Sequence, residues 1–111
     1  MTRTTIQDGI PAVAHEYGIT AADITGPRRD RKYSRPRQLA YVLSQSLGHS
    51  LPVVGEAFGA RDHTTVLHGI GVALEHCQRD AEAFNILEKL TRGLIDLPVF
   101  TRPKFKTVRA A

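Results

Sequence analysis

The segment from Gly55 to His68 constrains the fold of this chain more than any other part of its sequence. It reads Gly-Glu-Ala-Phe-Gly-Ala-Arg-Asp-His-Thr-Thr-Val-Leu-His, in which Phe58 closes one short helix and Gly59 suits the left-handed position of a tight turn. Asp62 can then cap the N-terminus of the next helix. Two helices joined in this way are typical of a helix-turn-helix.

The second helix of this pair opens with polar side chains and continues with apolar ones. Asp62 is followed by three polar residues, His63, Thr64 and Thr65. The buried side of the helix is expected to be supplied by Val66, Leu67 and Ile70. Polar side chains crowded at a helix N-terminus suit the edges of base pairs in a major groove. The alternative is that Asp62 only caps the helix, that the threonines are solvated and that His63 fills a gap.

The first part of the chain predicts two helices before the basic segment. Apolar residues at helical spacing place one helix over residues 5–17, with Gly18 as its stop. Pro11 is tolerated there if the helix begins later or is kinked. Thr20 is expected to cap a short second helix over residues 21–25.

Two cap-plus-proline signatures predict the starts of the third and fourth helices. Ser34 precedes Pro36, and Ser50 precedes Pro52, so each proline falls in a first turn, where its missing N–H costs little. A fifth helix is expected over residues 62–76. A sixth is marked by Phe84, Leu87, Leu90 and Leu94. The expected fold class is therefore all-α, with about six helices and a central helix-turn-helix.

The length of 111 residues allows one modest core. We expect a helical domain over residues 1–97 and a basic, flexible tail over residues 98–111. No apolar run approaches the roughly 20 residues needed to span a membrane, and the N-terminus lacks the features of a signal peptide. The single cysteine, Cys77, allows no internal disulfide and fits a reducing environment. We therefore expect a cytoplasmic location.

The positive charge of the chain is concentrated in two places. The formal net charge is +4, yet six basic residues and one acid, Asp30, lie between Arg28 and Arg37. The tail carries four basic residues and no acid, namely Arg102, Lys104, Lys106 and Arg109. Basic patches of this kind are an electrostatic footprint for phosphate groups. A solvated basic loop without a partner is the alternative.

The histidines and acids do not indicate a metal site or an active site. His63 and His68 are five residues apart on one predicted helix, whereas a helical metal pair has i, i+4 spacing. Asp62 and His63 are adjacent, so a helix directs their side chains apart, and no Ser-His-Asp arrangement is indicated. We expect no metal, no cofactor and no enzymatic activity.

The run from Phe58 to His68 resembles the signature of the C-terminal DNA-binding domain, domain IV, of the bacterial replication initiator DnaA, a Trp-repressor-like helical fold. The resemblance extends upstream through three further blocks, Arg28-Arg29, Arg35-Pro36-Arg37-Gln38 and Ser50-Leu51-Pro52, and includes Gly55. It covers residues 6–76 well. It implies sequence-specific binding to double-stranded DNA at DnaA boxes, which are short AT-rich elements.

The resemblance also implies a role for individual residues. Base contacts in the major groove are assigned to Asp62, His63, Thr64 and Thr65. Insertion into the minor groove is assigned to Arg29, with Arg28 as the second choice. Contacts to the phosphate backbone are assigned to Arg35, Arg37, Gln38, Ser50, Leu51, Pro52 and Arg61. Two alternatives stay open, because Arg37 can instead pair with an acid such as Glu56 and Leu51 can be part of the core.

The chain departs from the family pattern in ways that limit the resemblance. No P-loop pattern occurs in the sequence, so ATP binding in the family manner is not expected. Gln45 stands where the family often has lysine, and the residues after His68 are less basic than usual. We therefore expect a stand-alone, nucleoid-associated regulator that acts as a monomer on double-stranded DNA and has the initiator DnaA as a second candidate partner. The alternative is a protein-interaction module that keeps the fold but has little affinity for DNA.

Overall fold

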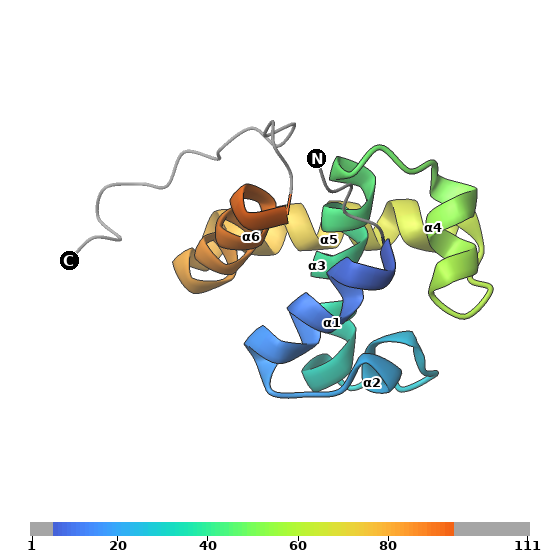
Figure 1. Cartoon of the computed structure of the whole chain (residues 1–111), viewed down its shortest axis with the longest axis horizontal. Coiled ribbons are helices and arrows are strands. Elements are labelled where there is room, and N and C mark those ends of the chain that lie inside the picture. The colour runs from blue at the N-terminus through green and yellow to red at the C-terminus, as the bar shows by residue number, and fades with distance from the viewer. Residues whose placement is uncertain (1–5, 95–111) are drawn as a thin grey trace.

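The computed structural model of the chain describes the backbone of residues 6–94 and the side chains of residues 6–91. Every regular element in this range is a helix, as the all-α prediction requires (Figure 1). The helices are α1 (Ile6–Tyr17), α2 (Ala21–Thr25), α3 (Arg31–Ser46), α4 (Leu51–Ala57), α5 (His63–Arg79) and α6 (Ala81–Leu94). None of them combines the length and the apolar character that crossing a membrane requires. The predicted tail over residues 98–111, with the boundary near residue 97, lies outside the described residues.

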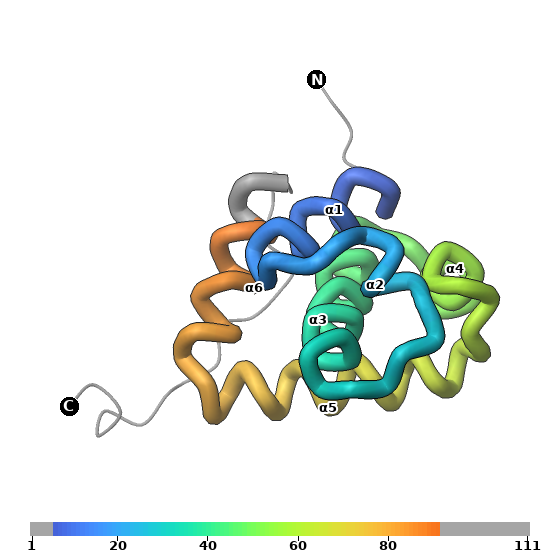
Figure 2. The backbone as a smooth tube through the Cα atoms, turned by 90° about the horizontal axis from the view of Figure 1, so that it is seen from below, coloured from blue at the N-terminus to red at the C-terminus, as the bar shows by residue number. Residues whose placement is uncertain are grey.

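Helix α3 lies at the centre of the fold and contacts each of the other described helices. Figure 2 shows it enclosed by α1, α4, α5 and α6. Because neighbours surround it, the consecutive residues 39–43 are all buried, and a one-sided apolar stripe is not observed. The ring of Tyr41 packs edge-on against Phe58, with centroids 4.9 Å apart, and so joins α3 to the end of α4.

Helix α5 crosses α3 at close range because residue 69 is a glycine. A Cβ atom at Gly69 would lie 2.7 Å from two ring atoms of Tyr41, and the tyrosine side chain is itself buried. No side chain larger than hydrogen fits there without a shift of the ring. The pairing of Gly69 with Tyr41 therefore fixes how α5 lies on the central helix.

The caps of the first two helices agree with the sequence prediction. Helix α1 runs through Pro11 and is followed by Gly18, whose φ of +68° is left-handed. Thr20 caps α2 with a reciprocal pair of bonds. Its hydroxyl accepts from the N–H of Asp23 at 3.1 Å, and the Asp23 carboxylate accepts from the N–H of Thr20 at 3.0 Å.

The predicted start of the third helix at Ser34 is wrong. Helix α3 begins at Arg31, and the carbonyl of Asp30 accepts from the N–H groups of Tyr33 at 2.8 Å and Ser34 at 2.7 Å. Pro36 thus lies inside the helix, where it donates no backbone hydrogen bond. Its fully buried ring offsets part of that cost. The basic segment is therefore a short loop followed by the first turns of a helix.

The turn between α4 and α5 has the predicted glycine and one unpredicted feature. Ser50 is the N-cap residue of α4, although its side chain makes no capping bond. Phe58 ends the helix and Gly59 has a φ of +90°, as expected. Ala60 is also left-handed, with a φ of +58°. The N–H of Arg61 closes the turn by donating to the carbonyl of Gly55 at 2.8 Å.

The buried face of α5 includes Val66 and Ile70 but not Leu67, which was expected there. Leu67 is 54% exposed. It lies about 100° around the helix from Val66, away from the i, i+4 pair that faces the core. The helix also continues to Arg79, beyond the predicted end at residue 76.

Gly55 and Gly71 provide a matched pair for testing how the turn packs. Gly55→Ala is expected to lower the free energy of unfolding by about 2 kcal/mol or more, because the new Cβ would lie 2.1 Å from the backbone oxygen of Arg61. Gly71→Ala is expected to raise it by about 1 kcal/mol, because nothing lies within 4 Å and alanine favours a helix. Denaturant unfolding measures both. Equal effects of the two substitutions would contradict this packing.

Candidate nucleic-acid interface

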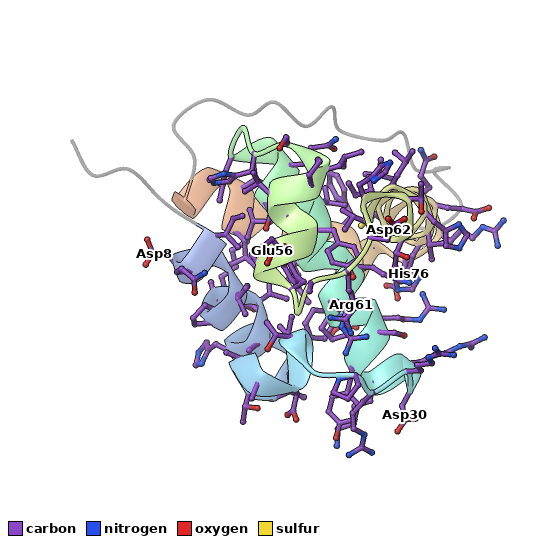
Figure 3. The ribbon with its side chains drawn as sticks, turned by 90° about the vertical axis from the view of Figure 1, so that its right-hand side faces the viewer. Asp8, Asp30, Glu56, Arg61, Asp62 and His76 are labelled. Carbon is purple, nitrogen blue, oxygen red and sulfur yellow. The ribbon has the colours of Figure 1, made fainter. Side chains whose placement is uncertain are left out.

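The N-terminus of α5 presents a set of exposed polar side chains. The carboxylate of Asp62 accepts from the backbone N–H of Thr64 at 3.1 Å and also from the Thr64 hydroxyl, so the predicted cap is confirmed. These two bonds from Thr64 hold the pKa of Asp62 below its usual value. His63 and Thr65 are exposed beside them. Figure 3 views α5 end-on and labels Asp62.

A groove of about 600 Å³ runs beside this helix. It lies between the end of α2, the α2–α3 loop, α3, the α4–α5 turn and α5. Five of the predicted site residues line it, namely Arg29, Arg37, Gln38, Arg61 and Thr65. The fold therefore brings three basic side chains of the predicted interface to the flank of the predicted reading helix.

The two arginines of the α2–α3 loop differ in their surroundings. Arg28 pairs with Asp30 at 3.2 Å, and its guanidinium lies 4.7 Å from the centre of the Tyr33 ring. Arg29 lines the groove, is exposed and makes no hydrogen bond or ion pair with the part of the chain that the structure describes. Of the two, Arg29 is the side chain that can extend toward a partner without breaking an existing contact.

Arg37, which was expected at the phosphate backbone, is 6% exposed and bonds inside the protein. Its Nε donates to the carbonyl of Ile24 at 2.5 Å, and its Nη2 donates to those of Gly26 at 3.0 Å and Asp23 at 3.2 Å. The alternative that Arg37 pairs with an acid such as Glu56 is not what the structure shows. Burial, followed by the nearby charge of Arg61, lowers the pKa of Arg37.

Arg61 is also bound to backbone carbonyls. Its Nη1 donates to Thr25 at 3.2 Å and to Phe58, and its Nη2 donates to Gly26 at 2.5 Å. Figure 3 shows Arg61 at the lower end of α4, where the turn approaches α2 and α3. Both arginines border the groove, but the bonds that the structure gives them hold the protein together.

The remaining predicted phosphate ligands do not line the groove. Arg35 is close enough to the C-terminal half of α5 that its charge adds to burial in lowering the pKa of His76. The other three residues, Ser50, Leu51 and Pro52, begin α4. Leu51 is half-buried and packs against the core, as one of the open alternatives held.

Several residues that line the groove were not predicted as site residues, and two of them are notable for their positions on α5 and α3. His68 and Ser34 both line it. His68 follows Thr65 by three residues on α5, and Ser34 precedes Gln38 by four residues on α3. Helical spacing from a predicted site residue could therefore have found both.

These features together define the class of protein. Helices α4 and α5 are joined by a short turn, and α5 has an exposed polar N-terminus. The turn and α5 border a groove with basic side chains, as in helix-turn-helix domains. The family described as "Bacterial dnaA protein helix-turn-helix" matches residues 6–72. The chain therefore belongs to the bacterial DnaA helix-turn-helix family, as its sequence predicted.

Relatives of the chain are chromosomal replication initiator proteins named DnaA. The protein from Roseobacter denitrificans is 41% identical over 93 residues, which are 83% of this chain and 20% of the relative. The protein from Neisseria meningitidis is 45% identical over 82 residues, which are 73% of this chain and 16% of the relative. The chain thus spans at most a fifth of the length of these relatives. Within its described residues, no three metal-binding side chains come together.

The Asp62 cap can be tested by comparing Asp62→Ala with Asp62→Asn. Asp62→Ala is expected to lower the melting temperature, because the first turn of α5 loses its acceptor for the Thr64 N–H. Asp62→Asn is expected to stay near the wild type, because asparagine caps about as well. Thermal unfolding followed by circular dichroism near neutral pH gives both values. A melting temperature of Asp62→Ala equal to that of wild type would contradict the cap.

The contribution of the cap is also expected to depend on pH. Because the folded pKa of Asp62 lies below the ordinary value of 3.8, its stabilisation is present above that value. It is lost as the pH falls through the folded pKa. The advantage of wild type over Asp62→Ala should therefore shrink as the pH falls below 3.8, while that of Asp62→Asn over Asp62→Ala should change less. Parallel changes in both differences would contradict the assignment.

Proposed function

We propose that this chain binds double-stranded DNA sequence-specifically, at sites that resemble the DnaA box. One observation supports this most: Thr65, near the exposed polar N-terminus of α5, and the unpaired Arg29 both line the same groove. The N-terminus of α5 can then read bases in one groove of the DNA while Arg29 reaches the adjacent groove of the duplex. Family membership over residues 6–72 supports the same function.

The reading residues are proposed to be Asp62, His63, Thr64 and Thr65. A carboxylate accepts from cytosine N4, and a threonine methyl group packs on the methyl group of thymine. A neutral imidazole such as that of His63 donates or accepts one hydrogen bond. In the free protein the N–H and the hydroxyl of Thr64 donate to the carboxylate of Asp62, so these two side chains lie together at the start of α5.

Arg29 is proposed to enter the minor groove, which is narrow and strongly negative in AT-rich DNA. Arg28 is the weaker candidate, because Asp30 and Tyr33 already engage it. Phosphate contacts are proposed for Arg35 and Gln38, and for the start of α4 at Ser50, Leu51 and Pro52. This arrangement suits one copy of the domain on each site.

The biological role is proposed to be regulation of replication initiation or of transcription. The relatives are named as chromosomal replication initiators, and DnaA is therefore a second candidate partner as well as a competitor for the same DNA sites. These 111 residues contain no P-loop pattern, so the proposed activity does not depend on ATP. We propose that the protein acts at the nucleoid.

The reading assignment predicts a loss of discrimination in Thr65→Ala. The variant is expected to lose about 1–3 kcal/mol in binding a DnaA-box duplex and much less on a scrambled duplex, because a base contact is removed. Fluorescence anisotropy with the two labelled duplexes measures this difference. Gln78→Ala is the matched control, since it is exposed on the same helix but far from the N-terminus.

Equal losses of Thr65→Ala on both duplexes would contradict base reading. Weak binding of the wild type to both duplexes, with little dependence on salt, would instead favour a protein-interaction module. In that case a search for protein partners would replace the search for DNA sites.

A further inference from the structure

The C-terminal end of α2 is partly buried against α3 and the α4–α5 turn, and its carbonyl groups need hydrogen-bond donors. A helix leaves its last four carbonyl groups without partners inside the helix. Here the consecutive carbonyls of residues 23–26 all accept hydrogen bonds from arginine side chains. Only two arginines, Arg37 and Arg61, supply these bonds.

The two arginines come from different elements of the fold. Arg37 belongs to α3 and binds three of the four carbonyls, those of Asp23, Ile24 and Gly26. Arg61 belongs to the turn before α5 and binds the carbonyls of residues 25 and 26. The carbonyl of Gly26 is shared by both guanidinium groups. The end of α2 is thereby tied to the central helix and to the helix-turn-helix at the same point.

The turn itself lies directly against the end of α2. A Cβ atom at Gly59 would lie 2.8 Å from the carbonyl oxygen of Thr25 and 3.3 Å from a guanidinium nitrogen of Arg61. The same Arg61 nitrogen also donates to the carbonyl of Phe58, the C-cap residue of α4. Arg61 therefore connects segments that are 35 residues apart in sequence.

The arrangement depends on the shape of the guanidinium as well as on its charge. No carboxylate in the described part of the chain lies within ion-pair distance of Arg37 or Arg61, so the carbonyl dipoles are what offset two neighbouring positive charges. A guanidinium presents five N–H donors in one plane and can bind several carbonyls at once. A lysine ammonium keeps the charge but not this fork of donors.

We infer that Arg37 and Arg61 are positioning residues that hold the base of the α2–α3 loop at a fixed place relative to α5. We call the hydrogen bonds from Arg37 and Arg61 to the carbonyls of residues 23–26 the clamp. The α2–α3 loop begins directly after Gly26, which the clamp holds, and Arg29 follows three residues later. The clamp therefore decides whether Arg29 and Thr65 can meet one stretch of duplex together. This inference rests on the proposed DNA binding, and it replaces direct phosphate contact as the main role of both arginines.

A double-mutant cycle between Arg29 and Arg61 tests the inference on DNA. In the wild type, Arg29→Ala is expected to weaken binding to the DnaA-box duplex about 10-fold. In the Arg61→Lys background the same change is expected to weaken it less than about 2-fold, because the loop no longer holds Arg29 in place. Arg37→Lys is the second background and is expected to behave in the same way. An equal loss in all backgrounds would overturn the inference, because the contribution of Arg29 would then not depend on Arg61 or Arg37.

Limited trypsin digestion without DNA tests the clamp independently of the proposed function. Arg61→Lys is expected to speed cleavage after Arg28 and Arg29 by about 10-fold relative to cleavage after Arg79, because the loop opens locally while the helices stay folded. Arg79→Lys is the control, since Arg79 is exposed and, among the described residues, pairs with Glu75. Mass spectrometry identifies the sites, and circular dichroism confirms the fold.

The outcomes separate the two proposals. Equal acceleration at the loop and at residue 79 would mean general destabilisation and would overturn the clamp. Unchanged cleavage at the loop would overturn it as well. If the loop opens selectively but the wild type does not prefer the DnaA-box duplex, the clamp stands and the proposed function fails.

Discussion

A helix that ends within a folded domain must find partners for its last carbonyl groups, and this requirement organises the functional face of the protein. The short helix α2 ends against α3 and against the turn before α5. Arg37 and Arg61 satisfy its four terminal carbonyls, and both bind that of Gly26. Without these donors the carbonyls, which are buried or partly buried, would each lack a hydrogen-bond partner at a cost in free energy. The α2–α3 loop and the helix-turn-helix are consequently placed together by one set of hydrogen bonds.

The core supplies the second constraint on the same face. Helix α3 is surrounded by the other helices, and α5 crosses it where Gly69 meets the ring of Tyr41. With that contact fixed and the turn closed on Gly55, the N-terminus of α5 can only lie at the surface. The exposed polar set that begins at Asp62 is therefore a consequence of packing on the far side of the helix.

The sequence predicted what depends on local rules and missed what depends on distant partners. The cap of α2 at Thr20, the left-handed Gly59 and the Asp62 cap each follow from neighbouring residues, and all three were correct. The predicted start of α3 was wrong because it assumed that Pro36 lies in the first turn. The structure instead accommodates Pro36 inside the helix, where its ring is buried. The partners of Arg37 lie 11 to 14 residues earlier, in carbonyl groups that no pattern of side chains identifies. The expected phosphate contact of Arg37 came from the family resemblance.

We propose that Thr65, near the N-terminus of α5, and Arg29 bind one specific DNA sequence together from the protein groove that both of them line. Fluorescence anisotropy of the wild-type chain with a DnaA-box duplex and a scrambled duplex, across a salt series, tests it most directly. We expect a preference for the box of about 10-fold or more, with affinity that falls steeply as salt rises. Equal affinity for the two duplexes at every salt concentration would contradict it.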